Sequence, residues 1–167
     1  MDENDDRPQP QRTLITSRGE YIDAVRRLLG LAQRELRIFD PDLADLDFGS
    51  RANIDALRRL LSGGRMHHVL IALHDVAHVK TRCPRLLDLI ATFPATLFIS
   101  RTEGEATRAQ DRFVLADETH VVRRPVAVQP RGVIFIDDPF EAHAMRQRFD
   151  EIWESSVPAV FATNLGI

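Results

Sequence analysis

Hydrophobic residues recur at steps of three and four along several stretches of the chain, the spacing of helices that bury one face. Ser17 and Glu20 have the spacing of a capping box and predict the start of the first helix. Pro84 interrupts the third pattern, and Asp138 precedes the last one in a position suited to capping. The patterns predict helices at about residues 20–35, 51–62, 76–90 and 139–153.

Short apolar runs lie between and after these helical patterns and are typical of strands. The run from His68 to Leu73 is almost wholly apolar, as expected of a strand covered on both faces. Strands are expected at residues 36–40, 68–73, 95–100, 113–116, 120–123, 126–128 and 132–136. Because helices alternate with strands first and strands follow one another later, we predict an α/β fold with a mixed β-sheet flanked by helices.

The chain has 167 residues, enough for one domain with a sizeable core. Residues 1–11 are acidic and almost free of apolar side chains, so we expect them to form a disordered tail. Residues 12–156 are expected to form a single α/β domain. The C-terminal tail, residues 157–167, contains Val160 and Phe161, by which it would dock on the body.

The charges of the chain nearly balance, with 22 basic against 25 acidic residues and a formal net charge of -3. The acidic excess lies in the first seven residues, and the remainder is neutral. A neutral body argues against bulk electrostatic attraction to nucleic acid or to anionic lipid, although a local basic patch stays open.

Cys83 is the one cysteine, which excludes an intramolecular disulfide and fits a reducing, cytoplasmic setting. The N-terminus has neither the positive charge nor the apolar run of a secretory signal. No apolar run approaches the roughly 20 residues that span a bilayer, so no membrane partner is expected.

The most distinctive stretch runs from Gln110 to Asp117 and combines a polar entry, a four-residue apolar core and an acid at the far end. Residues two apart on a strand share a face, so Gln110 and Arg112 are expected to lie together. The stretch resembles the half-site motif of the phospholipase D superfamily, His-x-Lys followed by four residues and Asp. Gln110 stands at the histidine position and Arg112 at the lysine position, and Asp117 matches.

The resemblance implies a phospholipase D-like sandwich over about residues 17–156. In that superfamily the histidine attacks a phosphodiester and the lysine holds phosphate oxygens. An amide is neither a comparable nucleophile nor a proton shuttle, so Gln110 cannot do the work of that histidine. Arg112 can still bind phosphate or carboxylate oxygens through its planar fork.

These residues lead to the hypothesis of a pseudoenzyme, a binding or interaction module for a phosphate-bearing ligand. Gln110, Arg112 and Asp117 are its candidate ligand-binding residues, joined by Arg124 from the next strand and Asp40 at a strand's carboxyl end. An equally weighted alternative is that Arg112 pairs with a carboxylate as part of the scaffold. Superfamily members build one site from two half-motifs, so a chain with one motif is expected to form a homodimer.

Two other functions stay open. The chain could be an active phosphodiesterase or nuclease that uses His120 with Asp117, or His74 with Asp40, or it could be an accessory subunit of a larger assembly. His74 and His78 have the four-residue spacing of zinc ligands, but a zinc site needs three or four ligands. No metal and no cofactor is therefore expected.

Overall fold

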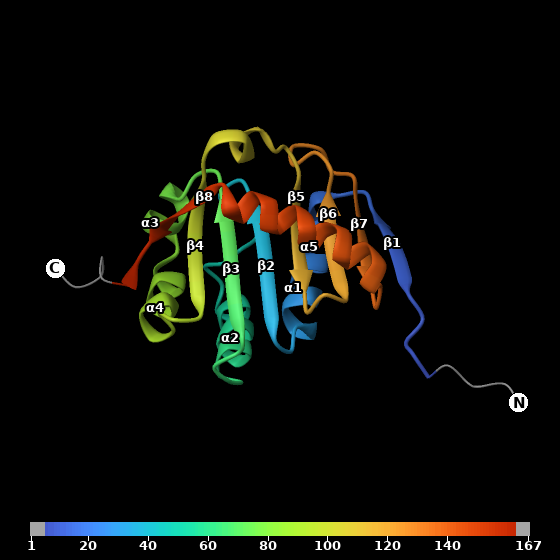
Figure 1. Cartoon of the computed structure of the whole chain (residues 1–167), viewed down its shortest axis with the longest axis horizontal. Coiled ribbons are helices and arrows are strands. Elements are labelled where there is room, and N and C mark those ends of the chain that lie inside the picture. The colour runs from blue at the N-terminus through green and yellow to red at the C-terminus, as the bar shows by residue number, and fades with distance from the viewer. Residues whose placement is uncertain (1–5, 163–167) are drawn as a thin grey trace, which may run out of the picture.

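A computed structural model describes residues 6–162 and shows one eight-stranded mixed β-sheet between two layers of helices (Figure 1). The strands are β1 Gln11–Ile15, β2 Glu35–Asp40, β3 His68–Leu73, β4 Leu97–Thr102, β5 Arg112–Ala116, β6 His120–Arg124, β7 Gly132–Ile136 and β8 Ser156–Val160. The helices are α1 Arg18–Leu31, α2 Arg51–Leu61, α3 Ala77–Arg82, α4 Pro84–Thr92 and α5 Pro139–Glu154, with a short 3-10 helix, η1, at Gly104–Arg108.

The strand order across the sheet is β1-β7-β6-β5-β2-β3-β4-β8. Strands β2, β3 and β4 run parallel, since helices connect them, whereas β5 pairs antiparallel with β2 and is followed by antiparallel β6 and β7. The predicted mixed α/β sheet is confirmed. We call the edge where β2 to β4 end the carboxyl edge, at the top of Figure 1, and the opposite edge the amino edge.

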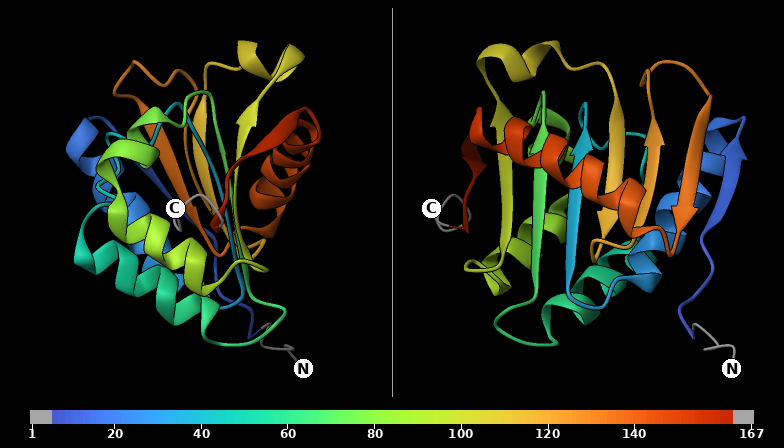
Figure 2. Two further views of the ribbon diagram at one scale, coloured as in Figure 1. Left: turned by 90° about the vertical axis from the view of Figure 1, so that its left-hand side faces the viewer. Right: turned by 45° about the vertical axis from the view of Figure 1, so that its right-hand side comes forward.

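The two faces of the sheet bury separate hydrophobic cores. Helix α5 crosses one face alone, and α1 to α4 cover the other (Figure 2). Phe113 and Phe149 belong to the core under α5, whereas Val114 and Leu28 belong to the core under α1 to α4. Neighbouring residues on β5 point to opposite faces, so Arg112 shares the α1 face with Val114.

Local signals in the sequence determine where α1 and α5 begin. The Ser17 side chain accepts the Glu20 N–H at 3.1 Å, and Glu20 in turn accepts the Thr16 N–H at 3.2 Å. Asp138 accepts the Glu141 N–H at 3.2 Å, with proline at the first position of α5. Both predicted caps are confirmed, and they satisfy N–H groups that a helix start leaves unpaired.

The strand predicted at Val126–Val128 is wrong, because residues 125–130 form bends and turns. Ala127 donates its N–H to the Gln110 carbonyl at 2.7 Å, and the Arg124 side chain donates to the Gln129 carbonyl at 2.6 Å. These contacts fold the segment across the carboxyl edge and leave no strand partner for it.

Both outer strands of the sheet come from segments in which no strand was predicted. β1 begins within the tail expected at residues 1–11, whose first five residues lie outside the described part, and pairs with β7. β8 pairs with β4, and residues 163–167 also lie outside the description. Across residues 6–162, no helix is both long enough and apolar enough to span a bilayer.

Candidate functional site

The two charged ends of the motif lie at opposite edges of the sheet. Arg112 opens β5 at the carboxyl edge, beside the end of β2, and Asp117 follows β5 at the amino edge. The structure therefore brings Arg112 together with Asp40 and Arg124 but separates all three from Asp117. Gln110 precedes β5 in an exposed loop at the carboxyl edge.

Arg112 is buried in an ion pair with Asp40. Its Nε donates to Asp40 Oδ1 at 2.7 Å, and a second guanidinium nitrogen contacts the same oxygen. Asp45 lies 3.3 Å from the remaining nitrogen. The exposed fractions of Arg112 and Asp40 are 2 % and 0 %, so the pair is excluded from water. The fork that would hold an anionic ligand is occupied by carboxylates of this chain.

The loop after β2 holds this arrangement closed. Asp40 accepts the backbone N–H of Leu43 at 2.7 Å, which fixes the first turn of the loop on the carboxylate. Asp45 also forms an ion pair with Arg18 of α1, and Asp47 lies 3.5 Å from Arg26 of the same helix. The acidic loop is thus tied to α1 on one side and to Arg112 on the other.

Tyr21 and Arg124 complete what we call the Arg112 cluster, defined as Tyr21, Asp40, Asp45, Arg112 and Arg124. Arg112 and Arg124 are direct neighbours across β5 and β6. Their guanidinium carbons lie 5.0 and 5.4 Å from the centre of the Tyr21 ring, within the range of cation–π contact. The Tyr21 hydroxyl is buried and has no hydrogen-bond partner among residues 6–162.

Burial dominates the protonation of the cluster. It raises the pKa of the Tyr21 phenol, and the negative charge of Asp40 raises it further. Burial also raises the pKa of Asp40, while Arg112 and the N–H groups of the loop oppose this shift and favour the carboxylate. Burial lowers the pKa of Arg124, as does the like charge of Arg112. Within the cluster, the pairing with Arg112 favours the charged form of Asp40 against the effect of burial.

The other residues of the central motif have structural contacts. Asp111 binds Arg148 of α5 through two bonds of 2.7 and 2.6 Å, which fastens that helix to the sheet. Asp117 accepts the backbone N–H groups of residues 33, 34 and 35 at 2.8, 2.8 and 3.1 Å. It thereby joins the β5–β6 turn to the entry of β2.

The candidate histidines are not paired as expected with Asp40 and Asp117. The His74 ring lies 2.6 Å from Thr102 Oγ1 and 2.8 Å from the Ala109 carbonyl, and it packs edge-on against Phe39. Phe39 and Asp40 point to opposite faces of the sheet, so His74 and Asp40 are separated. His120 Nδ1 accepts the Asp137 N–H at 2.9 Å. No cluster of three potential metal ligands exists among residues 6–162.

The residues that sequence reasoning missed are Tyr21 and Asp45. Tyr21 occupies a helical position that the spacing assigned to the core, and nothing in that spacing reveals two guanidinium groups above its ring. Asp45 lies in an acidic loop beyond Asp40. Its contact with Arg112 depends on the conformation of that loop, which the sequence pattern does not predict.

The chain has a phospholipase D-like fold. Solved structures with this fold include NucT from Helicobacter pylori, with 12% identity, a TM-score of 0.63, and coverage of 90% of this chain and 100% of that one. Nuc from Salmonella typhimurium, a phospholipase D family member, has 12% identity and a TM-score of 0.56, covering 90% and 99% of the two chains. At such identities the likeness establishes the fold alone.

A larger protein shares the same architecture. TrmBL2, an archaeal chromatin protein described with a novel mode of DNA binding, has 13% identity and a TM-score of 0.69. The match covers 94% of this chain but only 57% of TrmBL2. No curated protein sequence matches the chain. A family model, "Domain of unknown function (DUF7931)", matches residues 17–162, and the chain belongs to that family.

Proposed function

We propose that this protein is a phospholipase D-like domain without covalent phosphodiester chemistry, which works as a binding or interaction module. The observation that carries the proposal is the buried ion pair between Arg112 and Asp40 at the position of the superfamily's phosphate-holding lysine. Gln110 supplies no nucleophile at the histidine position. At these two motif positions the domain thus offers neither the attacking group nor a free cation for the covalent step.

An anionic ligand at the Arg112 cluster has to exchange with carboxylates of the chain. Asp45 is the easier of the two to displace, because its side chain is 40% exposed, whereas Asp40 is buried and held by the backbone. We therefore expect phosphate binding at Arg112 to strengthen when Asp45 is replaced by asparagine. Weaker or unchanged binding would contradict a retained anion pocket and leave the cluster as scaffold.

Turnover is the decisive test of the non-catalytic assignment. Purified protein is incubated with bis(p-nitrophenyl) phosphate and, separately, with single-stranded and duplex DNA. We expect no release above a blank purified in parallel. Turnover that is lost in His120→Ala or His74→Ala would overturn the proposal and favour the active phosphodiesterase.

The homodimer is part of the proposal, because superfamily sites assemble from two half-motifs and this chain has one. Light scattering after size exclusion is expected to give twice the mass of the chain at micromolar concentration. A monomer at that concentration would remove the dimer. A cytoplasmic location is likewise proposed from the single cysteine, and fractionation of the source cell would test it.

A further inference from the structure

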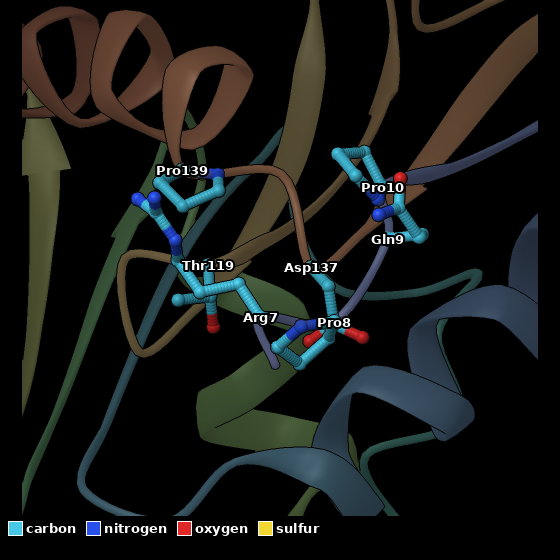
Figure 3. Close-up of a pocket in the computed structure, with 7 residues that line it drawn as sticks. All are labelled: Arg7, Pro8, Gln9, Pro10, Thr119, Asp137 and Pro139. Atoms are coloured by element: carbon cyan, nitrogen blue, oxygen red, sulfur yellow. The ribbon is translucent and has the colours of Figure 1, made fainter. Parts of the chain in front are cut away.

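A pocket lies at the amino edge of the sheet, at the opposite ends of the strands from Arg112. It has a volume of 600 Å³, and its walls include Arg27, Arg34, Asp117, Thr119, His120 and Asp137. A hollow of 470 Å³ adjoins it and shares Thr119 and Asp137, with residues 7–10 of the N-terminal segment running alongside (Figure 3). Volumes of this size accommodate small ligands.

We propose that this amino-edge pocket binds a small phosphate-bearing molecule, with Arg27 and Arg34 holding the phosphate and His120 donating a further hydrogen bond. The site lies apart from the Arg112 cluster. The proposal therefore stands or falls separately from the absence of phosphodiesterase chemistry.

The two arginines are available to a ligand. Within residues 6–162, the guanidinium groups of Arg27 and Arg34 form no ion pair or hydrogen bond, and both side chains are exposed. The other two arginines of α1 have carboxylate partners, because Arg18 pairs with Asp45 and Arg26 lies near Asp47. Free guanidinium groups bind phosphate oxygens through charged, often bidentate, hydrogen bonds.

His120 is oriented by its second ring nitrogen. Nδ1 accepts the Asp137 N–H at 2.9 Å, so the neutral ring carries its proton on Nε2. Nε2 has no hydrogen-bond partner in the described part of the chain, although the residue is only 9% exposed. A largely buried imidazole at the pocket wall thus presents one N–H donor that a phosphate oxygen can accept.

The negative groups around the pocket are largely neutralised. Asp117 directs its carboxylate to three backbone N–H groups. The C-terminal end of α1 has exposed carbonyls and partial negative charge, but Arg59 donates to the carbonyls of Leu29 and Ala32 at 3.0 and 3.1 Å. Asp137 keeps a carboxylate that is 34% exposed and can accept a hydrogen bond from a hydroxyl of the ligand.

The charge distribution favours a small molecule over a nucleic acid. A polyanion gains affinity from many cations along its length, and the body of this chain is neutral. Two arginines beside a carboxylate, in contrast, suit one phosphate on a hydroxyl-bearing molecule.

Asp137 also has a positive φ of 55°, as do Asp117 and Glu118 at 59° and 78°. Such backbone conformations are uncommon outside glycine.

The test is an amide NMR titration of the full chain with inorganic phosphate, adenosine 5′-monophosphate and, as the phosphate-free control, adenosine. We expect saturable shifts at Thr119, His120 and Asp137 with both phosphate compounds and none with adenosine. The variant Arg27→Gln/Arg34→Gln should weaken binding by about tenfold or more, since each charged hydrogen bond contributes substantially. The control variant Arg65→Gln/Arg131→Gln removes the same charge from exposed sites elsewhere and should bind as the wild type does.

Three outcomes would overturn the proposal. One is the absence of shifts at the amino edge with millimolar phosphate. Another is an equal loss of affinity in both double variants, which would indicate attraction to net charge alone. The third is preference for duplex DNA over the mononucleotide, which would indicate a nucleic-acid surface.

Discussion

Replacing Asp40 with asparagine should lower the free energy of unfolding by about 3 kcal/mol, because it removes one charge from a buried ion pair. Asparagine keeps the shape and can still accept the Leu43 N–H at 2.7 Å. Arg112, at 2% exposure, would be left with Asp45 at 3.3 Å as its carboxylate partner. Removal of one partner from a buried pair typically costs about 3–5 kcal/mol, and the remaining contact with Asp45 places this case at the low end.

Urea unfolding followed by circular dichroism measures the loss, and Asp45→Asn is the matched control. It removes the same charge from the same arginine at a 40% exposed side chain, where a pair contributes only about 0–1 kcal/mol. The double variant Asp40→Asn/Arg112→Met should recover part of the loss, because no charge is then buried alone. A loss of unfolding free energy in Asp40→Asn no larger than that in Asp45→Asn would refute a stabilising role for the buried pair.

Three further predictions concern stability. Tyr21 is the one tyrosine, and folding raises the pKa of its phenol above the unfolded value, which is near 10. The unfolded chain therefore loses the phenol proton at a lower pH than the folded chain does. Above pH 10 the free energy of unfolding should fall by up to about 1.4 kcal/mol per pH unit. Alkaline urea titrations should show this fall, with Tyr21→Phe less sensitive; equal sensitivity would contradict it. Asp117→Ala removes the acceptor of three backbone N–H groups, one of them part-buried, and should cost about 1–3 kcal/mol by the same assay, well above exposed Asp88→Ala. Gly132→Ala would place a Cβ 2.5 Å from the Arg123 carbonyl and should lower the melting temperature; an unchanged melting curve would refute that clash.

The sequence predicted the parts of the fold whose causes are local. The cap of α1 depends on Ser17 and Glu20, three residues apart, and the break before α4 depends on Pro84. It predicted β3 because a strand between two helical layers is apolar on both faces. The strand at Val126–Val128 was predicted from composition alone, and contacts from Gln110 and Arg124 fold that segment otherwise.

The contacts of the candidate site join residues that are far apart in the sequence, so the spacing of residues along the chain could not predict them. The sequence left open whether Arg112 binds a ligand or a carboxylate, and its two nearest acids were Asp111 and Asp117. The partner is Asp40, 72 residues away, whereas Asp111 binds Arg148 of α5. β1 was missed because four of its five residues are exposed, so no apolar alternation marks it.

The two outer strands differ in how they resist unwanted extension of the sheet. β8 contains Pro158, which has no N–H to donate, and its pairing with β4 shifts register near Ser100. β1 pairs with β7 in continuous register and contains no proline, and Leu14 on it is 61% exposed. A proline and an irregularity both discourage edge-to-edge aggregation, so β8 is protected and β1 is less so. Under crowded or partly denaturing conditions, self-association by strand addition would therefore begin on β1.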